Sequence, residues 1–275
     1  MNKNIQNIIA LLLEKNGIDI TQYDEDFLQK SIMKRIDDVN CNNLNDYYNL
    51  FKENSNERII FVESLNINYS EFFRNPFTFS VLETIAIPMI TAKLKNSKRK
   101  EIRIWSTACS NGQEAYSIAI LLEEMKLRCK DDLKYRIFAT DKSSIQIEQA
   151  KKGKYLKSEL NKVSILRFNN CFEKKDKKYL IKPELKSNIE FSVFDLLNEN
   201  LSSPQDSIFG NFDLIFCSNI LFYYNKICKN TILNKIKNNI CIDGFIITGE
   251  SERDFFIKNN YVELIMQSAI FYPKI

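Results

Sequence analysis

Apolar side chains recur every three or four positions through residues 4–66, a period that predicts amphipathic helices joined by short polar turns. The first helix is expected to run to Lys15, because Asn16-Gly17 is a common C-terminal pair. The second is expected over Asp24–Val39, where one apolar stripe continues along the segment.

The same period continues through two further helices. Tyr47 and Phe51 share one face of the third. Ser55 is a good N-cap for the fourth, which is expected to bury Ile59, Ile60 and Val62 or their neighbours. These helices predict a small all-helical N-terminal domain over residues 1–66. Residues 67–99 are expected to form a linker and a connecting helix.

From about residue 100 the pattern changes to short runs of β character separated by helical segments at about 113–127, 143–151 and 226–240. The expected strands are Glu101–Ser106, Tyr135–Thr140, Ile189–Phe194, Phe212–Cys217 and Gly244–Thr248. Alternation of this kind predicts parallel βαβ units, hence an α/β domain over residues 100–275 with a doubly wound, mostly parallel sheet. The stretch Tyr261–Tyr272 is expected to add an antiparallel hairpin at the sheet edge, making seven strands.

Residues 154–187 interrupt this alternation. Two short β-prone runs, Asn170–Glu173 and Tyr179–Lys182, flank the polar turn Lys174–Lys178. The segment is too short for a domain, so it is expected to be an inserted β-subdomain.

Composition narrows the class of protein. The net charge is only +4, which does not indicate a general nucleic-acid surface. Apolar runs such as Ile8–Leu13 are too short to cross a bilayer, and no signal-peptide pattern is present, so a soluble cytoplasmic protein is expected. The seven cysteines are scattered, with no two at metal-ligand spacing, so neither a disulfide framework nor a metal site is expected.

The chain contains no histidine. This excludes Ser-His-Asp and Cys-His nucleophile systems and zinc hydrolases with histidine ligands. Any enzymatic chemistry must therefore proceed without a histidine proton shuttle.

Polar residues follow the expected parallel strands. The first strand is followed by the loop Thr107–Glu114, the second by Asp141, the third by Asp195 and the fourth by Ser218-Asn219. Open α/β sheets bind ligands at this edge, and an acidic residue after the second strand suits ribose hydroxyls. Each residue taken singly could equally be an ordinary turn or helix-cap residue.

Several blocks of the sequence resemble the chemotaxis receptor methyltransferase (CheR) family over nearly the whole chain. The blocks are Asn68–Arg74, Ile104–Ala119, Phe138–Asp141, Phe212–Tyr224 and Gly249–Glu252. The resemblance implies a class I methyltransferase sheet with a helical N-terminal domain and an inserted β-subdomain. It also implies transfer of a methyl group from S-adenosylmethionine to receptor glutamates, with S-adenosylhomocysteine as the product.

The resemblance assigns roles position by position. Arg74 and Tyr223 match the residues that the family places beside the transferred methyl group, and Asp141 matches the expected ribose partner. The matched cofactor-binding positions are Asn68, Ser70, Arg74, Glu114, Asp141, Asp195, Leu196, Ser218 and Asn219. The chain departs from the family's usual residues at Ser70 (Thr), Ser218 (Arg), Asp195 (Asn) and Glu250 (His).

This chemistry is compatible with the missing histidines. A glutamate with a pKa of about 4.3 is already ionised at neutral pH, so methyl transfer to it needs no general base. The site must supply alignment and exclude water.

Two partner surfaces are implied. Lys30 and Lys34 lie four residues apart on the second helix, with Arg35 nearer the apolar stripe. Their plain interpretation is a solvated face; the resemblance makes them candidates for docking the acidic helices of the receptor's cytoplasmic region. The inserted β-subdomain also resembles the part of the family that binds the C-terminal peptide of a receptor. Not all members use this site, so the resemblance leaves open whether this insert binds such a peptide. Neither nucleic acid nor direct membrane insertion is expected.

Other functions stay open from sequence alone. The chain could be a cofactor-sensing regulatory module of the same fold, or a methyltransferase with another acceptor. A pure interaction module would fit the helical domain but would leave the polar strand ends unexplained.

Overall fold

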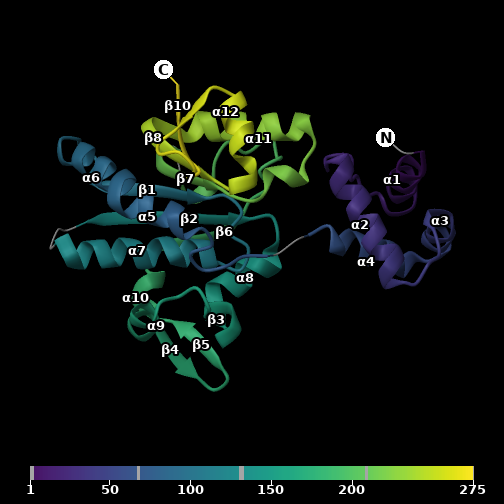
Figure 1. The fold of residues 1–275 in the computed structure, drawn as a ribbon, viewed down its shortest axis with the longest axis horizontal. Coiled ribbons are helices and arrows are strands. Elements are labelled where there is room, and N and C mark those ends of the chain that lie inside the picture. Colours follow the sequence, from purple (N-terminus) through teal and green to yellow (C-terminus); the bar gives the residue numbers. More distant parts are fainter. Residues whose placement is uncertain (1–2, 67–68, 130–132, 208–209, 275) are drawn as a thin grey trace. The chain divides into compact units, whose positions relative to one another are not determined.

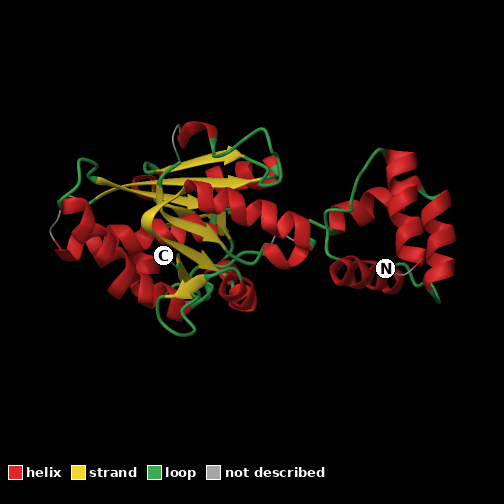
Figure 2. Ribbon diagram, turned by 90° about the horizontal axis from the view of Figure 1, so that it is seen from above, coloured by secondary structure: helices red, strands yellow, loops and turns green. Residues whose placement is uncertain are grey.

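A computed structural model describes residues 3–66, 69–129, 133–207 and 210–274 of the chain. These residues fall into two compact units (Figure 1). The first comprises residues 1–67 together with 220–231, and the second comprises residues 68–219 together with 232–275. In Figure 2 helices make up the first unit, and the long strands lie in the second.

The first unit contains four helices before residue 66: α1 (Lys3–Asn16), α2 (Glu25–Asp38), α3 (Leu44–Glu53) and α4 (Ser55–Ser64). As expected, α1 ends before Gly17, whose φ of 65° suits a glycine after a helix. Asp24 caps α2 by accepting a hydrogen bond from the main-chain nitrogen of Asp26. The expected helical N-terminal part is therefore confirmed.

The start of α4 differs from the expectation. Asn54, not Ser55, is its N-cap, and the Asn54 side chain accepts hydrogen bonds from Asn56 and Glu57. Ile59 and Ile60 are 49% and 36% exposed, whereas their neighbour Phe61 is fully buried. The extended backbone of Asn54 places its amide over the helix end, which moves the cap back by one residue.

Residues 220–231 are bound to the helices of the first unit. This stretch contains the 3-10 turn η4 (Leu221–Tyr223) and the beginning of α11 (Lys226–Asn239). The main-chain nitrogen of Asp24 donates to the carbonyl of Tyr223 at 2.8 Å. The rings of Tyr23 and Tyr224 stack with centroids 5.8 Å apart. Hydrogen bonds and stacking together hold this stretch against the start of α2.

The second unit is built on a seven-stranded sheet in the order β6-β2-β1-β7-β8-β10-β9. The strands are β1 (Glu101–Ser106), β2 (Lys134–Asp141), β6 (Ile189–Val193), β7 (Phe212–Cys217), β8 (Ile240–Thr248), β9 (Tyr261–Glu263) and β10 (Ile270–Pro273). The pairs among β6, β2, β1, β7 and β8 are parallel, whereas β10 is antiparallel to both of its neighbours. This confirms the doubly wound sheet with its closing hairpin.

Helices cover both faces of the sheet (Figure 1). They are α5 (Pro76–Val81), the π-helical turn η1 (Leu82–Ala86), α6 (Ile87–Lys95), α7 (Gln113–Cys129), α8 (Ser144–Lys152), α11 and α12 (Arg253–Lys258). One face of the sheet, with Ile104 and Ile137, packs with α6 and α7 in the main core. On the other face Trp105 and Phe138 pack against Phe212.

One continuous helix, Pro76–Lys95, is long and apolar enough to span a membrane by length and composition among the described residues. This differs from the expectation that apolar segments are too short. Val81, Leu82, Ile87, Ile90 and Leu94 of this helix lie in the main core beside the sheet. The helix is therefore a core helix of the second unit, and burial against the sheet accounts for its apolar composition.

The insert forms its own small sheet, with the order β3-β5-β4. Its elements are β3 (Lys154–Tyr155), the 3-10 turn η2 (Lys157–Leu160), α9 (Ile165–Cys171), β4 (Phe172–Lys175), β5 (Lys178–Ile181) and α10 (Pro183–Lys186). The hairpin β4–β5 confirms the expected β-subdomain. The two-residue strand β3, which pairs with β5, was not expected from the sequence.

Candidate active site

A cavity of about 230 Å³ opens in the second unit at the carboxyl ends of β7 and β8. It collects four of the residues singled out from the sequence: Arg74, Glu114, Ser218 and Asn219. The remaining lining residues are Asn75, Thr78, Phe79, Phe216, Ile247, Thr248, Gly249, Glu250 and Ser251. Residues from four parts of the chain thus converge where an open α/β sheet binds its ligands.

Glu114 is a half-buried acid that lines this cavity. It lies in the first turn of α7, and its Oε1 accepts a hydrogen bond from Ser106 Oγ at 2.6 Å. Burial raises the pKa of Glu114 to about 7, a shift that the Ser106 hydrogen bond and the charge of Arg74 partly offset. A cationic ligand group here would favour the ionised carboxylate.

Asp141 holds the loop between β1 and α7. Its two carboxylate oxygens accept hydrogen bonds from the main-chain nitrogens of Ser110 and Ser143, both at 2.9 Å. Ser110 has a φ of 49°, in the left-handed region that few non-glycine residues occupy. Burial raises the pKa of Asp141. The carboxylate therefore fixes a strained loop at the edge of the sheet.

The same loop carries buried polar atoms without protein partners. Asn111 Oδ1 and Gln113 Oε1 lack a hydrogen-bond partner among the described residues. Buried polar groups are normally paired, so these two oxygens leave the start of α7 with unmet hydrogen-bonding capacity. Neither residue lines the cavity. Gly112 sits between them, and a Cβ there would come within 2.9 Å of Ala150 Cβ.

Glu252 organises the opposite wall of the cavity. Its Oε2 accepts hydrogen bonds from the main-chain nitrogens of Asn219 and Gly249 and from Thr248 Oγ1, at 2.8 to 2.9 Å. Asn219 has a φ of 60°. The sequence placed Glu252 in a block that matches the family but indicated no role for it; the available signal was an acid four residues after the end of β8. Ser218 donates only a weak hydrogen bond, at 3.4 Å, to the carbonyl of Ile247.

Arg74 reaches the cavity from the segment before α5. Its guanidinium carbon lies 5.1 Å from the centre of the Tyr69 ring. The preceding residue, Phe73, has a φ of 49°. Ser70 is half-buried and is not a lining residue of the cavity, and Asn68 lies outside the described residues.

The remaining candidates lie elsewhere. Asp195 and Leu196 follow β6, where the exposed Asp195 accepts a hydrogen bond from the nitrogen of Leu197 and Leu196 is buried. Tyr223 belongs to the first unit, where its ring packs edge-on against Phe27 at 5.0 Å. Tyr223 is not among the residues that line the cavity.

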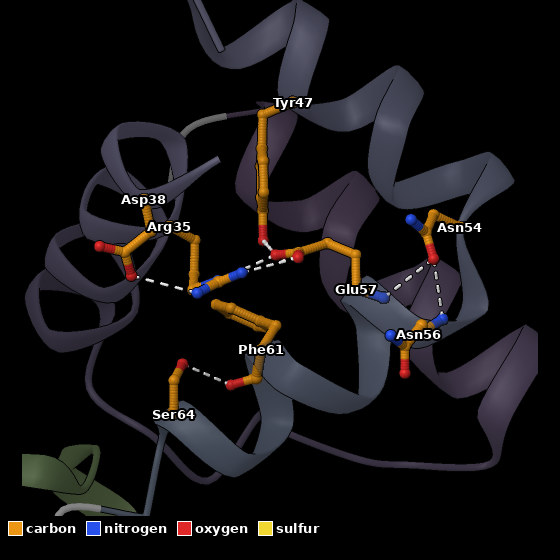
Figure 3. Close-up of polar contacts among 8 residues, drawn as sticks. All are labelled: Arg35, Asp38, Tyr47, Asn54, Asn56, Glu57, Phe61 and Ser64. Atoms are coloured by element: carbon orange, nitrogen blue, oxygen red, sulfur yellow. Dashed lines mark hydrogen bonds and ion pairs between the residues drawn. The ribbon is translucent and has the colours of Figure 1, made fainter. Parts of the chain in front are cut away.

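The three cations of α2 differ in their surroundings. Lys30 and Lys34 are exposed. The guanidinium of Arg35 forms two hydrogen bonds, of 2.9 and 2.7 Å, with the buried carboxylate of Glu57 (Figure 3). Tyr47 also donates to Glu57, at 2.9 Å. Arg35 is therefore bound inside the helical unit, and the two lysines are the cations of this set that face solvent.

Comparisons with known proteins agree with this geometry. Residues 68–270 match a family model described as "CheR methyltransferase, SAM binding domain". Residues 3–65 match one described as "CheR methyltransferase, all-alpha domain".

Individual relatives cover most of the chain. The chemotaxis protein methyltransferase of Borreliella burgdorferi is 28% identical over 90% of this chain and 87% of its own length. The chemotaxis protein methyltransferase Cher2 of Pseudomonas putida is 30% identical over 77% of this chain and 75% of its own. Among solved structures, DszA carbon methyltransferase gives a TM-score of 0.38 at 12% identity, over 88% of this chain and 50% of that one.

Proposed function

This chain belongs to the CheR family of chemotaxis protein methyltransferases, and we propose that it methylates glutamate side chains of chemoreceptors. That it is an S-adenosylmethionine-dependent enzyme acting on chemoreceptors follows from the family. The glutamate acceptor and the roles of single residues are the proposal. It rests on one observation: Arg74, Glu114, Ser218 and Asn219 line one cavity at the carboxyl edge of the sheet.

The residues present suit S-adenosylmethionine. The Glu114 carboxylate suits a cationic group, and Asp141 follows β2, where ribose hydroxyls are bound in sheets of this kind. We place Asp195 and Leu196 beside the adenine. Asn68, Ser70, Ser218 and Asn219 complete the proposed contacts.

When bound, S-adenosylmethionine would supply an electrophilic methyl group. The glutamate carboxylate would form a C–O bond to this group as the C–S bond breaks, which would give a methyl ester and S-adenosylhomocysteine. No proton moves in this step, so the chain needs no base. Arg74 orients the carboxylate without a full ion pair, which would stabilise the ground state more than the transition state. Tyr223 contributes to the same alignment.

Receptor docking is proposed for the exposed Lys30 and Lys34 of α2. The receptor's cytoplasmic helices carry the acidic acceptors, so cations on the enzyme would steer the encounter. The exposed hairpin β4–β5 is a site where a receptor C-terminal peptide could add. A cytoplasmic location follows from this proposal, since that is where the acceptor region lies.

Methyl-labelled S-adenosylmethionine, incubated with the protein and receptor-containing membranes, tests this function. Glutamyl methyl esters release volatile labelled methanol on mild base treatment. Cofactor binding without methanol release would instead support a regulatory module, and base-stable label would support another acceptor.

A further inference from the structure

Lys162 of the insert contacts the segment that carries Arg74. It lies in the turn between η2 and α9, and its Nζ is 2.6 Å from Glu71 Oε2. The same Nζ donates to the main-chain carbonyl of Arg74 at 3.3 Å. One lysine therefore binds both the residue three before Arg74 and the backbone of Arg74 itself.

The side chain of Arg74 is connected to the same group of residues. Its guanidinium lies over the ring of Tyr69. A hydrogen bond between the side chains of Tyr69 and Glu71 raises the pKa of Tyr69, and the hydrogen bond from Lys162 lowers the pKa of Glu71. The backbone and the guanidinium of Arg74 are thus both held by contacts that meet at the Glu71–Lys162 pair.

Contacts from the insert to two aromatic rings support the residues between Glu71 and Arg74, which are Phe72 and Phe73. Phe72 is fully buried and packs edge-on against Tyr155 of β3 at 4.9 Å and Phe172 of β4 at 5.5 Å. Arg167 of α9 lies 4.2 Å from the centre of the Phe73 ring. The left-handed backbone of Phe73 needs such support, because the conformation is unfavourable for a bulky residue.

The insert also contacts the loop between β1 and α7. The hydroxyl of Tyr155 donates to the main-chain carbonyl of Asn111 at 2.8 Å. One small subdomain therefore contacts both Arg74 and the loop between β1 and α7, the two segments on which the proposed chemistry depends.

We infer that Lys162 is a positioning residue for methyl transfer, which acts through Glu71 and the backbone of Arg74. This inference rests on the proposed function, because it requires Arg74 to align the reacting groups. It gives the insert a role inside the catalytic unit in addition to any contact with a receptor tail.

Stability alone does not account for the arrangement. The Lys162 and Glu71 side chains are 43% and 28% exposed, and ion pairs this open contribute little to folding. Catalysis is far more sensitive, since misplacing a reacting group by about 1 Å can lower the rate by about 10²-fold. Loss of Lys162 should therefore reduce turnover much more than stability.

The test compares Lys162→Ala with Lys162→Arg and a matched control, Lys157→Ala. Lys157 is an exposed lysine of the neighbouring turn η2, so Lys157→Ala removes one positive charge, as Lys162→Ala does. Lys162→Ala should lower kcat about tenfold, with the receptor KM unchanged and the melting temperature lowered by no more than about 4 °C. Lys162→Arg should recover most of kcat, and Lys157→Ala should match the wild type.

A rise in receptor KM shared by Lys162→Ala and Lys157→Ala, with kcat unchanged, would overturn the inference in favour of simple charge attraction. Amide hydrogen exchange of residues 69–75 gives a second measurement that needs no turnover. These amides should exchange faster in Lys162→Ala than in the wild type, and equal exchange would also overturn the inference. Failure of the wild type itself to methylate receptors would instead contradict the proposed function.

Discussion

The carboxylate of Glu252 accepts a hydrogen bond from the main-chain nitrogen of Asn219 at 2.8 Å, across the ends of β7 and β8. Glu252 is 3% exposed, and the same oxygen binds Thr248 and Gly249. The close packing leaves no room for a side chain at Gly249, where a Cβ would lie 2.8 Å from Asn219 Oδ1. One buried acid therefore shapes a wall of the proposed cofactor cavity.

Replacement of Glu252 by Ala should affect both folding and binding. It leaves two main-chain donors and one hydroxyl without their acceptor, which should lower the free energy of unfolding by about 2–3 kcal/mol. Cofactor affinity, measured by calorimetry at a temperature where the variant is folded, should also fall because Asn219 loses its support. Asp254→Ala, which removes an exposed acid nearby, is the control. Unchanged cofactor affinity in Glu252→Ala would restrict Glu252 to a folding role.

Cofactor binding should depend on pH through Glu114. Its pKa of about 7 means that the free protein carries the neutral acid below neutrality and the carboxylate above it. If the carboxylate binds a cationic group of S-adenosylmethionine, affinity should rise about tenfold between pH 6 and pH 8. Glu114→Gln should bind S-adenosylmethionine more weakly and should lack the rise in affinity that comes from ionisation of Glu114. Because titration of the ligand affects both proteins equally, the difference between their pH profiles reports Glu114 alone. Parallel pH profiles for both proteins would contradict the assignment.

The same group affects stability in the opposite sense. The folded pKa of Glu114 is raised above its ordinary value of 4.5, so the folded state binds the proton more tightly. The stabilisation is complete below about pH 4.5 and is lost as the pH rises through about 7. Denaturant unfolding of wild type and Glu114→Gln should therefore diverge across this window, with the wild type losing the more stability.

Arg35 should behave as a folding residue. Removing its guanidinium leaves the Tyr47 hydroxyl as the remaining donor to the buried Glu57 carboxylate among the described residues, so Arg35→Ala should lower the free energy of unfolding by about 3–5 kcal/mol. Asp38, its exposed partner, provides the control, since Asp38→Ala should cost no more than about 1 kcal/mol. Equal, small losses in both variants would contradict the structural role.

Lys30 and Lys34 should behave as encounter residues. Reversing both charges should raise the receptor KM at low salt and reduce its dependence on ionic strength, while kcat stays unchanged. Lys52→Glu, an exposed lysine of α3, serves as the comparison. An unchanged KM at low salt in the double variant would rule out docking through this face.

The sequence predicted most of the fold because its signals are local. Alternation of short β runs with helices placed the parallel strands, and polar residues after those strands marked the ligand edge. Asn54 and Ser55 are both good caps, so the choice between them depended on backbone geometry that no pattern shows. The strand β3 has only two residues and exists because β5 pairs with it.

The site was predicted less completely because its contacts are distant in sequence. Arg35 meets Glu57 at 22 residues and Lys162 meets Glu71 at 91, so neither pairing has a periodic signal. Tyr223 packs with the helices of the first unit, although its motif follows a strand of the second. The roles proposed for single residues came from the resemblance of motifs to the family. The contacts that support those residues could be identified only from the structure.

Mapping the methylated residue tests the central claim most directly. A receptor cytoplasmic fragment is treated with S-adenosylmethionine and either the wild-type chain or Arg74→Ala, and modified peptides are sequenced by mass spectrometry. The account predicts base-labile methyl esters on glutamate side chains with the wild type, and none with a folded Arg74→Ala variant. Methyl groups on another residue type, or full methylation by Arg74→Ala, would contradict it.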